Sequence, residues 1–224
     1  MSRIYIANDL EFSGDQIEAN FCLSWGSSVW DGTTQTCLAE HYTPFQRPEN
    51  RGWEDRCLRE FWMSDPLLIA EVERVKRGEG LTVQDGVTNK VQWFEQVVQD
   101  YAGGDSTRIQ FVSDTCAADN TWMNYLLSQI EHKPIHTFFG YHRDPICTSS
   151  YALGLLREGV APEWGKYWSE DKMVRKKFSI PATEKPTAPH DHNPVHDSAN
   201  LMQEFFIHMK YSKEHLYNLR PIKQ

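Results

Sequence analysis

The sequence predicts an α/β fold in which helices cover a mixed β-sheet. Two observations favour this class: strand-like segments joined by hairpin signals open the chain, and buried strands alternate with helical patterns from about residue 54 onward. Opening hairpins followed by alternating strands and helices are typical of a sheet with both antiparallel and parallel pairs. No internal repeat or low-complexity segment interrupts the pattern.

The first fifty residues read as strands. Residues 3–8 form a short buried-type strand, residues 18–30 are apolar and rich in β-formers, and residues 34–41 return as a strand after the Asp31-Gly32 turn signal. An Asp-Gly pair between two strand patterns is typical of a hairpin. Residues 42–52 carry Pro and Gly and are expected to form a loop.

Helical spacing begins at Glu54, where Leu58, Phe61 and Trp62 recur on one side. A second helix is expected to start at residues 64–66 and to run to about residue 77. The glycine-containing segment 78–86 is predicted to break the pattern before an amphipathic helix over residues 89–101, which Gly103-Gly104 ends.

The second half alternates strands and helices. Strands are expected at 108–113 and 135–139, and helices at 119–130, around 149–156 and at 197–219. Residues 164–178 are aromatic and charged, and residues 179–194, rich in Pro and His, are expected to form a loop. At 224 residues the chain fits one substantial domain or at most two small ones, and we expect a single domain, 1–224.

Composition narrows the functional classes. With 40% hydrophobic residues the chain can fill a core, and its net charge of −8 argues against an extended nucleic-acid-coating surface. The five cysteines form no CxxC pair, which favours a reducing, intracellular setting over a disulfide framework. No apolar run reaches the length of a membrane span, and the N-terminus does not resemble a signal peptide.

Several carboxylates follow predicted strands. Asp9 and Glu11 lie where the first strand ends, and strand alternation places both on one face, where they could share a cation. Asp119 opens a helix after the strand at 108–113, with Asp114 as a competing candidate at the strand's own end. A solvated strand end and a helix cap are the alternative interpretations.

The third candidate segment is late in the chain. His192 lies on the loop five residues before Asp197, which is placed in the first turn of the last helix. A capped helix after a surface loop would explain both residues without any activity. His190, His192 and His196 also allow a zinc site, although they lack the i, i+4 spacing of common helical histidine pairs.

Together these three segments resemble the DnaQ-like exonuclease superfamily in its DEDDh branch. Its acidic first motif is matched by Asp9-Leu10-Glu11, its second by Asp119 before an apolar helix, and its third by His192 five residues ahead of Asp197. The resemblance implies a ribonuclease H-like mixed sheet flanked by helices, and it makes residues 158–189 an extended loop or insertion.

The same resemblance implies an activity. A member would be a metal-dependent 3′-5′ exonuclease that cuts single-stranded DNA or RNA from the 3′ end and releases nucleoside 5′-monophosphates. Two Mg²⁺ or Mn²⁺ ions would be held by four carboxylates, and His192 would be the general base. Phe12 and Trp62 are candidate stacking surfaces for the terminal base, or else core aromatics. The metal ligands would be Asp9, Glu11, Asp119 and Asp197.

Within the superfamily the chain is most similar to the phage-type DexA group, because of Glu60-Phe61-Trp62 before Pro66 and because of residues 143–148. This likeness is compatible with a phage- or virus-encoded protein. One alternative is a catalytically degenerate nuclease fold that binds nucleic-acid ends or a protein. The other is a zinc hydrolase built on the three histidines. A basic cluster is either a solvated helix face or a phosphate-tracking surface: Lys172, Arg175, Lys176 and Lys177.

Overall fold

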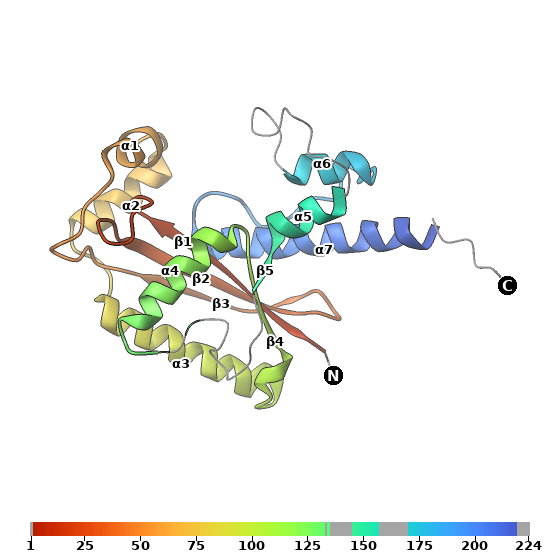
Figure 1. The fold of residues 1–224 in the computed structure, drawn as a ribbon, viewed down its shortest axis with the longest axis horizontal. Helices are drawn as coiled ribbons and strands as arrows, with labels where there is room; N and C mark the ends of the chain where they lie inside the picture. The colour runs from red at the N-terminus through yellow and green to blue at the C-terminus, as the bar shows by residue number, and fades with distance from the viewer. Residues whose placement is uncertain (1, 133, 135–144, 157–169, 219–224) are drawn as a thin grey trace.

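The computed structural model describes residues 2–132, 134, 145–156 and 170–218, and these residues form a mixed five-stranded sheet with helices on both faces (Figure 1). The strand order is β3-β2-β1-β4-β5. β2 is antiparallel to β1 and to β3, whereas β4 is parallel to β1 and to β5. The predicted fold class is therefore confirmed. The strands are β1(Ile4–Phe12), β2(Cys22–Asp31), β3(Cys37–Pro44), β4(Ile109–Ser113) and β5(Ile146–Cys147).

The predicted hairpin joins β2 to β3. Asp31 closes its turn, because the Oδ1 atom accepts hydrogen bonds from the backbone N–H of Thr33 at 2.7 Å and of Thr34 at 2.9 Å. The turn is longer than an Asp-Gly dipeptide, and Gln35 adopts a left-handed φ of 57°. The returning strand consequently starts at Cys37 and not at residue 34.

Two helices cover one face of the sheet, and a third crosses the other. α3(Val83–Ala102) and α4(Cys116–Ser128) pack on Ile4, Ile6 and Leu10 of β1. α7(Pro194–Asn218) packs on Ala7 and on apolar residues of the neighbouring strands. Because side chains alternate along a strand, Asp9 and Glu11 share the α7 face with Ala7.

The predicted break over residues 78–86 was wrong in its second half. Helix α3 begins at Val83, capped by Thr82, whose side chain accepts a hydrogen bond from the N–H of Asp85 at 3.1 Å. Gly86 lies inside the helix. A Cβ there would come within 2.6 Å of the Phe45 ring, so this glycine permits close helix–strand packing and does not end the helix.

A small lobe follows β3 (Figure 1). It comprises α1(Asp55–Cys57), the π-helical turn η1(Leu58–Trp62) and α2(Pro66–Lys76). Asp65 caps α2, which begins at Pro66, within the predicted start at residues 64–66. The lobe is held to the sheet by an apolar cluster that includes Phe21, just before β2, and Leu23 within it.

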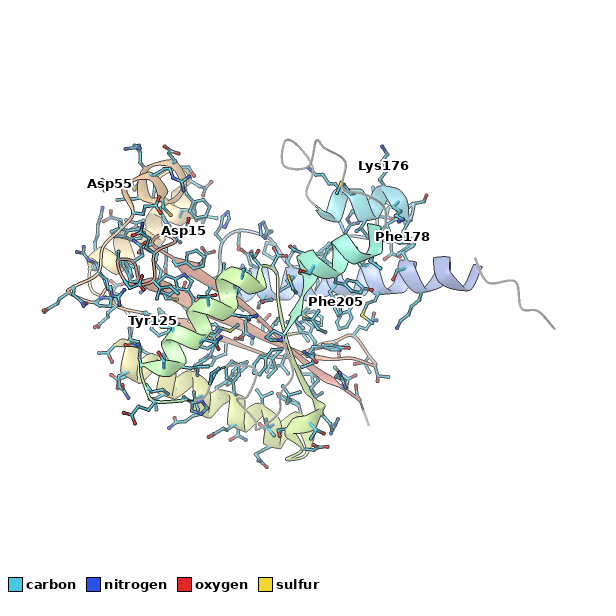
Figure 2. The ribbon with its side chains drawn as sticks, in the orientation of Figure 1. Asp15, Asp55, Tyr125, Lys176, Phe178 and Phe205 are labelled. Atoms are coloured by element: carbon cyan, nitrogen blue, oxygen red, sulfur yellow. The ribbon has the colours of Figure 1, made fainter. Side chains whose placement is uncertain are left out.

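A second lobe is formed by α5(Thr148–Leu156) and α6(Glu170–Lys177), and the short 3₁₀ turn η2(Ser106–Arg108) precedes β4. The predicted strand at 135–139 lies outside the described residues. Where the expected insertion is described, it contains α6, which packs against α5 and α7 through Val174 and its neighbours. Lys176 on this helix points away from the molecule (Figure 2). None of the helices within the described ranges has the length and apolar character to cross a bilayer.

Candidate active site

Asp9 lies near the end of β1, directly after a buried anchor. Asn8 is fully buried, and its Oδ1 atom accepts hydrogen bonds from Trp25 Nε1 at 3.0 Å and Ser27 Oγ at 2.6 Å. These bonds fix the strand beside Asp9. The Asp9 Oδ2 atom is buried and has no hydrogen-bond partner among the described residues. Burial, and then the nearby charge of Asp119, raise the pKa of Asp9 well above its usual value.

Asp119 reaches β1 from the first turn of α4. Its carboxylate accepts hydrogen bonds from the backbone of Thr115 and of Leu10, and the residue is only 5% exposed. Burial and then the charge of Asp114 raise its pKa to about 8. Asp114 itself is exposed, and it accepts hydrogen bonds from the hydroxyls of Thr148 and Ser149, each at 3.0 Å. The two candidates thus face different neighbours: Asp119 faces β1, and Asp114 faces α5.

Asp197 lies in the first turn of α7 and is 6% exposed. Its two oxygens accept hydrogen bonds from the backbone N–H of Asp191 at 3.0 Å and of His192 at 3.1 Å. These bonds hold the preceding loop against the helix, and His192 adopts a left-handed φ of 60° there. His190 Nδ1 is 3.4 Å from Asp197 Oδ1. Burial raises the pKa of Asp197.

Gly26 allows α7 to begin beside the acidic strand end. Asp9 pairs with Gly26 in the β1–β2 ladder, and a Cβ on Gly26 would lie 2.0 Å from the carbonyl carbon of Pro194. Real Cβ atoms do not approach a backbone atom so closely. The start of α7 therefore packs directly on the backbone of β2 at Gly26. This contact brings Asp197 near Asp9 and Glu11.

His192 lies between Glu11 and the small lobe. Its Nδ1 atom is 3.8 Å from Glu11 Oε1, and its ring packs edge-on against Phe61 with the centroids 4.9 Å apart. Glu11 raises the pKa of His192, while burial raises the pKa of Glu11. Ligand atoms of Glu11, His192 and Asp197 all lie within 4.8 Å of one another.

The donor set fits a hard divalent cation. Most of its donor atoms are carboxylate oxygens, and one of them, Asp9 Oδ2, is buried and has no hydrogen-bond partner among the described residues. The carboxylates also raise one another's pKa, and a bound cation would offset this repulsion between negative charges. The three-histidine arrangement is not formed, because His196 Nδ1 lies 3.0 Å from Asp191 Oδ2 instead. One imidazole, that of His192, belongs to the group of three side chains among the described residues that could hold a metal ion.

The two aromatic candidates differ in placement. Trp62 is 0% exposed and donates from Nε1 to the Phe12 carbonyl at 3.2 Å. Of the two interpretations, its burial fits a core aromatic and not a stacking surface. Phe12 is partly exposed, with one ring face stacked on Trp122 at 5.6 Å. Phe61, which was not among the predicted stacking residues, is the ring that contacts His192.

Comparison with known structures places this fold among nucleases. E. coli exonuclease I in complex with an oligonucleotide matches with a TM-score of 0.60 at 9% identity, over 97% of this chain and 43% of that one. Cell-death related nuclease 4 matches with a TM-score of 0.59 at 13% identity, over 93% of this chain and 64% of that one. A 3′-exonuclease described in 3′-end recognition of a histone mRNA stem-loop matches with a TM-score of 0.58 at 10% identity, over 95% and 64%.

The fold class is therefore ribonuclease H-like, the fold of these nucleases. This chain spans less than two thirds of the length of each of the three. No family model matches the sequence, and no curated protein matches it.

Proposed function

We propose that this protein is a DnaQ-like 3′-5′ exonuclease of the DEDDh type, with residues 1–224 forming its exonuclease domain. It would hydrolyse single-stranded DNA or RNA from the 3′ end and release nucleoside 5′-monophosphates. The observation that carries the proposal is the convergence of Asp9, Glu11, Asp119 and Asp197, together with His192, from segments far apart in sequence. The similarity to exonuclease structures supports it.

The four carboxylates would hold two Mg²⁺ or Mn²⁺ ions. Bound there, the cations would acidify a water and offset charge on the departing oxygen. Asp9 would gain from a bound cation, because burial and the charges of the other three carboxylates all raise its pKa.

His192 would act as general base. Its imidazole takes the proton from a water whose oxygen forms the new bond to phosphorus, the bond from phosphorus to the 3′ oxygen breaks, and solvent protonates that oxygen. Glu11 strengthens the base by raising the pKa of His192. Phe61 limits its ring orientation, and the loop position leaves the side chain 37% exposed to a substrate.

Phe12 would stack on the terminal base with the ring face that Trp122 does not cover. Stacking of this kind tolerates any base and suits an enzyme that removes successive nucleotides. The likeness of residues 60–62 and 143–148 to the DexA group supports placing the chain beside that group.

The test compares Asp9→Asn and Asp197→Asn with the wild type on end-labelled DNA and RNA oligonucleotides. We expect chelator-sensitive release of 5′-monophosphates from the wild type and a loss of at least about 100-fold in each variant, since each removes a ligand charge. Asp100→Asn, an exposed change of the same kind on α3, is the control.

Undiminished hydrolysis by either site variant would refute the assignment. A wild-type protein that releases no nucleotide but binds the oligonucleotides would instead be a binding module on a nuclease fold.

A further inference from the structure

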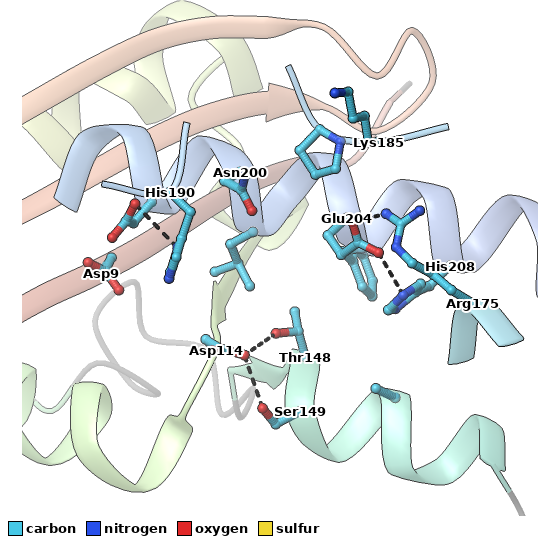
Figure 3. Close-up of a pocket in the computed structure, with 15 residues that line it drawn as sticks. Asp9, Asp114, Thr148, Ser149, Arg175, Lys185, His190, Asn200, Glu204 and His208 are labelled. Carbon is cyan, nitrogen blue, oxygen red and sulfur yellow. Dashed lines mark hydrogen bonds and ion pairs between the residues drawn. The ribbon is translucent and has the colours of Figure 1, made fainter. Parts of the chain in front are cut away.

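A cavity of about 550 Å³ runs from the candidate active site along α7 (Figure 3). It begins at Asp9 and Asp197, passes between α7 and the N-terminal end of α5, and ends near Arg175. Neither Glu11 nor His192 lines it. The cavity therefore reaches Asp9 and Asp197 without reaching the proposed base, and it is large enough for one nucleotide.

The polar groups on the α5 wall have a defined hydrogen-bonding direction. Thr148 and Ser149 both donate their hydroxyl protons to Asp114 Oδ1 at 3.0 Å, so toward the cavity their oxygens can only accept. Across the cavity, the Asn200 amide donates to the Ala188 carbonyl at 2.8 Å, which leaves its oxygen as a further acceptor. This part of the wall suits a ligand that donates hydrogen bonds.

The other walls suit a sugar and a base. Apolar surface comes from residues of α5, α7 and the loop before α7, namely Ala152, Pro186, Leu201 and Phe205. Arg175 is paired with Glu204 and also donates to the Glu184 carbonyl. The cavity lining carries charges of both signs, from Asp114 and Glu204 and from Arg175 and Lys185. Charge alone therefore does not select a phosphate there, and a neutral nucleoside is accommodated.

The geometry of in-line displacement indicates which part of the substrate would occupy this cavity. The attacking water lies on the His192 side, so the departing 3′ oxygen must lie on the opposite side of the phosphorus. That oxygen belongs to the sugar of the penultimate nucleotide. In RNA the adjacent carbon of the same sugar carries the 2′-hydroxyl, a hydrogen-bond donor.

We propose that this cavity is the subsite for the penultimate nucleoside, and that the oxygens of Thr148 and Ser149 accept a hydrogen bond from its ribose 2′-hydroxyl. The inference rests on the proposed exonuclease function and specifies its substrate: the enzyme favours a ribonucleotide at that one position. The sugar of the terminal nucleotide does not contact Thr148 or Ser149, because it lies on the other side of the scissile phosphate.

The test uses DNA oligonucleotides with a single ribonucleotide at the penultimate or at the third position from the 3′ end. For the wild type, the penultimate ribonucleotide should raise kcat/KM by about five-fold, the effect of one ordinary hydrogen bond. The third-position ribonucleotide should have no effect. A penultimate 2′-fluoro sugar keeps the electron withdrawal of the hydroxyl but cannot donate, and it should behave as DNA.

Ser149→Ala should bring the ratio of kcat/KM between the ribose and deoxyribose substrates toward one. Thr148→Val, which preserves side-chain shape, should do the same. Ser150→Ala, an exposed change one position further along α5, should retain it. Equal melting temperatures would show that the variants fold. A wild-type preference shared by the 2′-fluoro sugar, or retained in both Ser149→Ala and Thr148→Val, would overturn the subsite.

Binding measured with Ca²⁺ in place of Mg²⁺ separates this proposal from the exonuclease assignment. If no oligonucleotide is cut, the exonuclease proposal fails. The subsite then stands only if the penultimate ribonucleotide tightens binding to the wild type and not to Ser149→Ala. Equal affinities for the ribose and deoxyribose oligonucleotides would overturn it.

Discussion

At the scale of single residues, Lys90 is the least expected feature of the core. It is 0% exposed on α3, and its Nζ atom lies 5.2 Å from the ring centroid of Trp25 and 5.1 Å from that of Trp93. It donates to the carbonyls of Trp25 and His41 at 3.2 and 3.3 Å. Burial lowers the pKa of Lys90 well below its usual value, and it lowers the pKa of His41 to about 4.

Lys90 should therefore make stability depend on pH. Between its lowered folded-state pKa and the ordinary value of about 10.4, the unfolded chain binds a proton that the folded chain does not, so the free energy of unfolding rises with pH. Urea denaturation at pH 7 and pH 9.5 should show this rise in the wild type, by up to about 1 kcal/mol per pH unit relative to Lys90→Met. Lys76→Met removes an exposed ammonium as the control. A difference between wild type and Lys90→Met that does not change with pH would contradict the expectation.

At the scale of elements, the contact between β2 and the start of α7 decides whether a site exists. Gly26 provides the bare backbone on which Pro194 rests, opposite Asp9 in the ladder. The π-helical turn η1 has a related role, because it directs Phe61 toward His192 while Trp62 stays in the core. Such irregular turns often occur at functional sites.

Gly26→Ala should disrupt the site while the rest of the fold stays intact. The added Cβ meets backbone that cannot yield without moving the helix, so α7 must shift and carry Asp197 away from Asp9 and Glu11. We expect a loss of exonuclease activity of at least about ten-fold with a circular dichroism spectrum like that of the wild type. Gly52→Ala, where a Cβ would meet no atom within 4 Å, should keep full activity. Equal activities of the two variants would show that α7 is not positioned by this contact.

At the scale of the whole molecule, the carboxylates lie where three separate units meet. Asp9 and Glu11 end a central strand, Asp119 begins a helix that packs on one face of the sheet, and Asp197 begins the helix on the other face. A cation bound among them would join these units and would bind the folded chain alone.

Cations should consequently stabilise the fold. At 100-fold excess over its dissociation constant, Mn²⁺ should add about 2.7 kcal/mol to the free energy of unfolding. For a chain of this size that corresponds to a rise of roughly 5–10 °C in Tm. Thermal melts with Mn²⁺ and with EDTA check this, and Asp119→Asn should lose most of the rise. An equal rise in wild type and variant would place the cation elsewhere.

Much of the local structure could be predicted from the sequence. The strand at 3–8, the hairpin, the capped helix after Asp65 and the final helix all have local causes in alternation, turn residues and caps. The exceptions have tertiary causes. Gly86 lies inside α3, where it allows Phe45 to pack closely, and α6 lies in the segment expected to be an extended loop or insertion, with Val174 buried against α5 and α7.

By itself the sequence determined which chemical groups are available for a site. These are carboxylates at the end of one strand and at the start of two helices, and a histidine five residues before the last carboxylate. Only the tertiary structure decided which groups meet. It turned Asp119 toward β1 and Asp114 toward α5, placed Phe61 on His192, and opened a cavity beside Asp9. The physical reason is that strand and helix patterns depend on neighbours in sequence, whereas a site depends on distances between distant segments, which packing sets.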